Sequence, residues 1–133
     1  MAIGNLPAED SAAGLIRLHH GTDLLSATDI LNNGLSRARA ASQNVTGEFW
    51  ATTDAADADT FAQVNPAGGI PSRYSFDVEE AVLAGLLAAN PPRANQHGPD
   101  WYEFLPASYP LLNQHMVNRQ VISPVPGDRK AHV

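Results

Sequence analysis

The side chains that could carry out acid–base or metal chemistry in this chain of 133 residues are five histidines and fourteen acidic residues. His19 and His20 are adjacent on a predicted strand, so they point to opposite faces and cannot bind one ion together. The sequence has no cysteine and no His-x₃-His or HExxH spacing, which are common zinc-ligand patterns. It also lacks the G-x-S-x-G turn that presents a nucleophilic serine. We therefore predict no metal site.

A more informative set of residues is spread over three predicted strands. The first strand ends in His20-Gly21-Thr22, and the helix after it ends in Asn33-Gly34-Leu35. The second strand lies within residues 47–54 and is followed by a helix that carries Phe61. A later strand, residues 101–105, places one acid, Glu103, on an otherwise apolar face. An acid in such a position is typical of a functional site.

Short elements must position these residues, and apolar periodicity locates them. The predicted strands cover residues 15–20, 48–52, 73–78, 101–105 and 117–123. The predicted helices run from the cap Ser26 to about residue 33, from the cap Asp54 to residue 64, from 79 to about 89, and briefly after the cap Ser108. No glycine-rich phosphate loop follows the first strand. We therefore favour an α+β domain, with a split, mixed β-sheet and short helices, over a doubly wound parallel sheet.

Composition predicts a single domain, since the chain is 44% hydrophobic and long enough for one core. We expect a flexible lead-in at residues 1–14, a domain at 15–123 and a tail at 124–133. No segment has the pattern of a membrane span or a signal peptide, and a chain without cysteine fits the cytoplasm. The net charge of −6, with no basic cluster, disfavours non-specific nucleic-acid binding.

Together these residues resemble the ADP-ribosyltransferase superfamily, whose fold is shared by diphtheria-type toxins and poly(ADP-ribose) polymerases. The resemblance covers residues 15–122. In that family the first strand carries His-Gly-Thr or His-Gly-Ser, a helix ending in an ILxxGL-like stretch follows, and a glycine-plus-aromatic strand leads into the next helix. Residues 103–113 look like the strand and helix that carry the glutamate in small bacterial members. The resemblance implies an ADP-ribosyltransferase-like fold, with NAD as substrate and no metal.

Two residues are catalytic by this resemblance. His20 would hydrogen-bond the adenosine ribose of NAD⁺. Glu103 would hydrogen-bond the nicotinamide ribose and stabilise the positive charge that develops there as nicotinamide leaves.

The resemblance also implies the other NAD-binding residues. The backbone of Gly21 would hold the nicotinamide amide, because a residue without Cβ allows the ligand to approach closely. Thr22 would lie beside it as a polar support. Phe49 occupies the family's tyrosine position with Trp50 next to it, and Phe61 lies near the place of a second stacking aromatic residue.

The implied function is that of an NAD-dependent mono-ADP-ribosyltransferase or NAD glycohydrolase. It would act in the cytoplasm or as a delivered toxin, and its acceptor, a protein or a nucleic acid, is not identified. The arginine-specific branch of the family has Gln or Glu two residues before the catalytic Glu. Trp101 stands there in this sequence, which disfavours arginine as the acceptor. Glu48, Glu79 and Glu80 are rival carboxylates.

Two alternatives remain open. Phe49 lacks the hydroxyl of the family's tyrosine, which favours a catalytically inactive NAD- or protein-binding module of the same fold. RNA 2′-phosphotransferases share the His-Gly-Thr start, and Arg37 and Arg39 would suit a phosphate, but the histidine expected in the next strand is absent.

Overall fold

A computed structural model describes residues 14–36, 49–64, 69–89 and 101–126, and within them the chain forms five strands and four α-helices. The α+β class predicted from the sequence is confirmed. The strands are β2 (Leu15–Asp23), β3 (Phe49–Thr52), β4 (Pro71–Glu79), β5 (Trp101–Phe104) and β6 (Val117–Ile122). The helices are α1 (Leu24–Asn33), α3 (Ala55–Gln63), α4 (Glu80–Ala89) and α5 (Tyr109–His115), with the 3₁₀ turn η1 (Pro106–Ser108) before α5.

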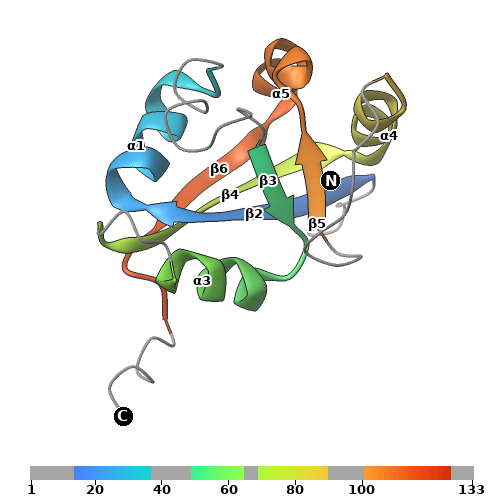
Figure 1. Cartoon of the computed structure of the whole chain (residues 1–133). Helices are drawn as coiled ribbons and strands as arrows, with labels where there is room; N and C mark the ends of the chain where they lie inside the picture. Colours follow the sequence, from blue (N-terminus) through green and yellow to red (C-terminus); the bar gives the residue numbers. More distant parts are fainter. Residues whose placement is uncertain (1–13, 37–48, 65–68, 90–100, 127–133) are drawn as a thin grey trace, which may run out of the picture.

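The strands form one sheet in the order β5-β3-β2-β4-β6, and every described pairing is antiparallel. The prediction of a mixed sheet is therefore wrong. A helical connection can bring the next strand in from either end, so the alternation of elements did not fix strand direction. β2 pairs with β4 along its whole length, whereas a single residue pair, His19 with Thr52, registers β2 with β3. β3 and β5 consequently run across the direction of β2 and β4 (Figure 1).

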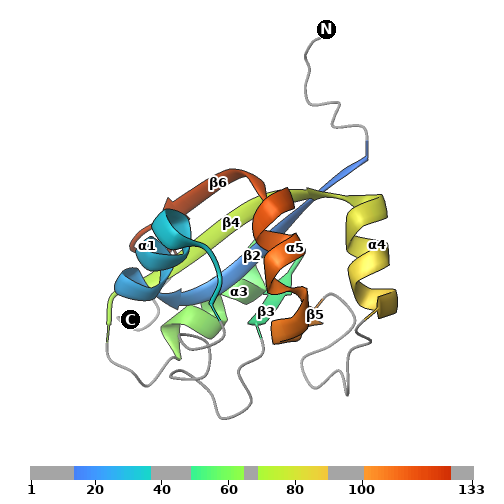
Figure 2. The same cartoon turned by 90° about the horizontal axis from the view of Figure 1, so that it is seen from above.

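The apolar core lies on one face of the sheet, under α1, α4 and α5. Tyr74, Phe76 and Val78 alternate on β4 as the sequence predicted, and all three are fully buried there. They meet the buried sides of the three helices, whose core residues are Ala27, Ile30, Leu83, Leu86, Tyr109 and Leu112. These helices lie above β2 and β4 in Figure 1, and Figure 2 shows the same layer from above.

Most predicted helix ends are correct, and one is not. Asp54 caps α3 by accepting hydrogen bonds from two backbone N–H groups, and Gly34 ends α1 with a positive φ of 80°. The cap of α1, however, is Asp23, whose carboxylate accepts from the backbone N–H and the hydroxyl of Ser26. Ser26 is therefore inside the first turn, because the longer β2 runs directly into the helix. Ser108 precedes α5 without a capping hydrogen bond from its side chain.

The domain extends beyond its predicted end. Val125, placed in the predicted tail, is 3% exposed, and its N–H donates to the carbonyl of Pro71. The side chain of Gln63 donates to the carbonyl of Pro126. The segment up to residue 126 therefore packs on β4 and α3. The predicted lead-in, apart from Gly14, and the rest of the tail lie outside the described residues.

Of the described helices, α3 is the one that lies on the other face, below β2 in Figure 1, and Gly21 sets how close it comes. A Cβ built on Gly21 would overlap the carbonyl oxygen of Ala58 and lie 2.9 Å from the backbone nitrogen of Ala62. Both atoms belong to the backbone of α3, which cannot move aside as a side chain can. Glycine at this position therefore allows helix and strand to touch.

We predict that Gly21→Ala lowers the free energy of unfolding by about 3 kcal/mol, because the added methyl group must push α3 away from β2. Chemical denaturation followed by far-UV circular dichroism measures this change. Gly85→Ala is the matched control: nothing lies within 4 Å of its Cβ position in α4, so it should stabilise the protein by about 0.5–1 kcal/mol. Equal effects of the two substitutions would contradict the packing role of Gly21.

Candidate functional site

Strands β2, β3 and β5 meet around Trp50. The His20 ring lies against Phe49 with a centroid separation of 4.3 Å, and its Nδ1 is 2.7 Å from the carbonyl oxygen of Trp50. A side chain of β2 thus supplies a hydrogen bond to β3, next to the one residue pair that registers the two strands. The position of the His20 ring is fixed by both contacts.

The hydrogen bond also fixes the proton on His20. A carbonyl oxygen can only accept, so Nδ1 must be the protonated nitrogen. Burial lowers the pKa of His20 to about 4, although the bond to Trp50 opposes the shift. The ring is therefore neutral at neutral pH, and its Nε2 carries a lone pair that can accept a hydrogen bond.

Glu103 lies in β5 in direct register with Trp50. Directly paired residues of an antiparallel sheet project from the same face, so Glu103 shares the face of Trp50. Glu103 is only 2% exposed. Trp101 projects from this face as well, and its ring meets that of Phe61 from α3 edge-on, with 5.6 Å between centroids. A buried carboxylate thus stands among aromatic residues from three elements.

Trp50 is the residue that links the two predicted catalytic groups. Its carbonyl is bonded to His20, and its side chain is on the same face as Glu103. The side chain of His20 itself lies on the opposite face of the sheet, against Phe49. Phe49 alternates with Trp50 and faces the core, where it is 4% exposed and packs on Phe76 and Phe104. The expected ligand-facing role of Phe49 does not fit this burial; of the two neighbouring aromatic residues, Trp50 is the one that is partly exposed.

Gly21 and Thr22 are both buried at this end of β2. The explanation given for Gly21, that it makes room for a ligand, needs correction, since the space beside its Cα is filled by α3. Thr22 is paired with Ser72 of β4. Among the rival carboxylates, Glu79 and Glu80 are exposed where β4 meets α4. Glu48, Arg37 and Arg39 lie outside the described residues.

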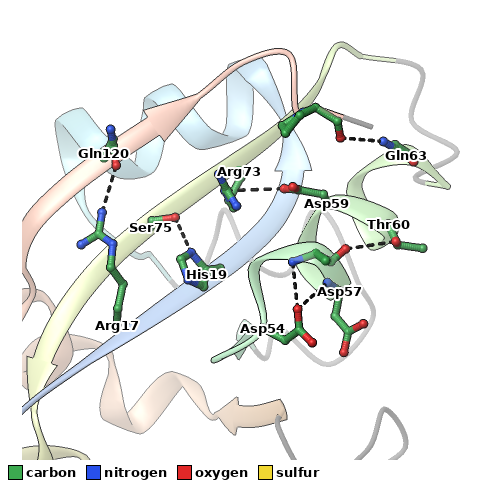
Figure 3. Close-up of polar contacts among 12 residues, drawn as sticks. Arg17, His19, Asp54, Asp57, Asp59, Thr60, Gln63, Arg73, Ser75 and Gln120 are labelled. Atoms are coloured by element: carbon green, nitrogen blue, oxygen red, sulfur yellow. Dashed lines mark hydrogen bonds and ion pairs between the residues drawn. The ribbon is translucent and has the colours of Figure 1, made fainter. Parts of the chain in front are cut away.

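A polar cluster on the α3 face of β2 and β4 was not predicted as a site (Figure 3). It consists of the following pairs: Nδ1 of His19 is 2.7 Å from Oγ of Ser75, Nη1 of Arg17 is 3.0 Å from Oδ1 of Asp77, and Nε of Arg73 is 3.5 Å from Oδ1 of Asp59. Strand alternation correctly put Arg17 and His19 on the face opposite Leu18. Their partners are more than fifty residues away in the sequence, so no local pattern could identify them.

Burial and neighbouring charges alter the titration of this cluster. Burial, followed by the charges of Arg73 and Arg17, lowers the pKa of His19 to about 4. Burial raises the pKa of Asp59, and the charge of Arg73 opposes that shift. His19 is therefore neutral at neutral pH.

Within the described segments, no group of three or more His, Asp or Glu side chains could hold a metal ion. No helix in the same segments is long and apolar enough to cross a membrane.

No protein-family model matches this chain, and searches of curated proteins and of solved structures find no similar protein.

We predict that the protein loses stability as the pH falls from about 6.5 to 4. The unfolded chain binds a proton at His20 below about pH 6.5, whereas the folded protein resists this down to about pH 4. Stability attributable to neutral His20 is thus fully present above this range, and about 3 kcal/mol of it is lost across the range. His19 adds to the loss with the same sign.

His20→Gln removes this titration while keeping an N–H that can reach the Trp50 carbonyl. Denaturation at a series of pH values gives the free energy of unfolding as a function of pH. Between pH 4 and 6.5 this free energy should change less steeply for the variant than for the wild type. At pH 8 the difference in free energy of unfolding between the two proteins reflects lost packing alone, and this difference serves as the reference. Parallel curves would show that His20 does not stay neutral in the fold.

Proposed function

We propose that the protein is an NAD-dependent mono-ADP-ribosyltransferase or NAD glycohydrolase, with an ADP-ribosyltransferase-like arrangement of its sheet. The main support is the junction at Trp50, which the neutral His20 and the buried Glu103 reach from different strands and from different faces of the sheet: His20 bonds its backbone carbonyl, and Glu103 lies beside its side chain. These are the two residues for which the sequence resemblance implies catalytic roles.

His20 is suited to recognise a sugar hydroxyl. Because Trp50 holds the proton on Nδ1, Nε2 accepts a hydrogen bond from the ligand. An adenosine ribose offers such hydroxyl donors. Phe49 supports this role indirectly, since it packs against the His20 ring and limits its rotation.

Glu103 is suited to stabilise charge during cleavage. The bond between the ribose carbon and the nicotinamide nitrogen breaks, nicotinamide leaves with the bonding electrons, and positive charge develops on the ribose. A carboxylate in a buried site interacts with that charge more strongly than one in water would. Trp50 and Phe61 supply the aromatic surfaces against which a flat nicotinamide ring could stack. Water or an acceptor nucleophile then bonds to the ribose carbon.

The direct test is release of nicotinamide from NAD⁺, measured by chromatography. We predict that Glu103→Gln, which keeps the shape of the side chain, lowers the rate by a factor on the order of 10²–10³. Glu80→Gln is the control, because Glu80 is exposed and should leave the rate unchanged. Circular dichroism confirms that both variants are folded. Equal rates for wild type and Glu103→Gln would exclude Glu103 from this role.

The second candidate is a non-catalytic NAD- or protein-binding module of the same fold. Phe49, at the family's tyrosine position, offers no hydroxyl and is buried in the core, and this favours the alternative. Calorimetry distinguishes the two: NAD⁺ binding without nicotinamide release, in the presence of candidate protein and nucleic-acid acceptors, would establish the binding module.

A further inference from the structure

The polar cluster contains two arginines that differ in how fully their donors are used. Arg17 donates through Nη1 to Asp77 and to the carbonyl of Asn118, and through Nη2 to Gln120. Both ends of its guanidinium fork are therefore occupied. Arg17 holds β2, β4 and β6 together and has little left to offer a ligand.

Within the part of the chain that the structure describes, Arg73 uses only one edge of its guanidinium. Its Nε lies 3.5 Å from Oδ1 of Asp59, and among the described residues no hydrogen bond involves either of its Nη groups. The side chain is 12% exposed, and Nε itself is completely buried. The part of Arg73 that solvent reaches is thus not the edge that faces Asp59.

His19 lies beside this arginine and can supply a second donor. His19 pairs with Ser75 and Arg73 with Gly21, so both side chains project from the α3 face two residues apart (Figure 3). The charge of Arg73 helps to lower the pKa of His19. When the Ser75 hydroxyl donates to Nδ1, the neutral ring carries its proton on Nε2 and can donate there.

We propose that Arg73 and His19 form a binding site for a phosphoryl oxyanion. The two Nη groups of Arg73 would donate to two oxygens of the anion, and Nε2 of His19 would donate to an oxygen of the same group. A planar guanidinium fork matches a phosphate in this way, and hydrogen bonds to a charged group are about twice as strong as neutral ones. Asp59 holds the remaining edge of Arg73 and orients the fork.

The anion can come from two sources, which share this chemistry. One is the pyrophosphate of NAD⁺, and this assignment rests on the proposed function. The other is a phosphate group of a separate ligand. The charges of Asp59, Asp54 and Asp77 also face the cluster, so we expect binding of small inorganic anions to be weak and sensitive to salt.

The test uses the whole chain and follows the His19 ring by NMR during titration with sodium phosphate and sodium pyrophosphate at constant ionic strength. We expect a saturable shift of the His19 resonances. Arg73→Gln should weaken binding about tenfold or more, since it removes the charge and the fork. Arg73→Lys, which retains the charge, should give an intermediate loss and carries the test if Arg73→Gln does not fold. Arg17→Lys is the matched control: it keeps the charge that acts on His19 and should change the affinity less than about twofold, because both ends of the Arg17 guanidinium are already bonded within the fold.

Absence of a saturable shift in the wild type would overturn the site, and so would equal affinities in the Arg73→Lys and Arg17→Lys variants. A parallel titration with NAD⁺ assigns the source. Equal weakening of NAD⁺ and pyrophosphate by Arg73→Lys indicates the dinucleotide, whereas weakening of the inorganic anions alone indicates a separate ligand. A wild type that binds pyrophosphate but neither binds NAD⁺ nor releases nicotinamide would refute the proposed function and leave the anion site standing.

Discussion

The close approach of α3 to β2 at Gly21 is the constraint on which both candidate sites depend. Because no side chain separates them, the backbone of α3 rests on the strand. The helix then presents Asp59 to Arg73 in β4 and Phe61 to Trp101 in β5. A larger residue at position 21 would lift the helix and disturb both contacts at once. The aromatic surroundings of Glu103 and the orientation of Arg73 are therefore linked through one glycine.

The adjacent residues His19 and His20 project from opposite faces of β2, and each makes contacts on its own face. His20 lies against Phe49, a member of the core under α1, α4 and α5, and binds the backbone of β3. His19 lies under the other face and binds Ser75. Each is kept neutral mainly by burial. Both use Nδ1 for their partner but in different roles: Nδ1 of His20 must donate to a carbonyl, whereas Nδ1 of His19 can accept from a hydroxyl.

Local patterns were sufficient to locate the elements. Alternation along β4 identified its buried face, and Asp54 and Gly34 marked helix ends by their capping chemistry. What local patterns could not supply is pairing. The antiparallel direction of every strand pair depends on contacts distant in sequence, and so does the cap of α1, because the length of β2 is set by its pairing with β4. The end of the domain was missed for the same reason, since Val125 is held by Pro71.

The candidate site was predictable in part: local patterns selected residues, but strand pairing decided how they lie relative to one another. His20 and Glu103 were selected from their types and positions, and strand pairing connects them through Trp50. Phe49 and Trp50 were adjacent candidates, and only the packing of the sheet shows which of the two faces the core. The role of Gly21 in helix packing required knowledge of where α3 lies.

Stability alone does not explain the pair formed by Arg73 and Asp59. Moving two charges out of water costs several kcal/mol per ion, and a buried pair recovers this only when its geometry and its remaining hydrogen bonds are good. Here Nε of Arg73 lies 3.5 Å from Oδ1 of Asp59, and neither atom has a hydrogen bond among the described residues. Replacement of a buried ion pair by apolar residues of similar volume is often neutral or stabilising. An arginine oriented by one carboxylate, whose two outer nitrogens make no hydrogen bond within the described segments, is accounted for more directly by an anionic ligand than by the fold.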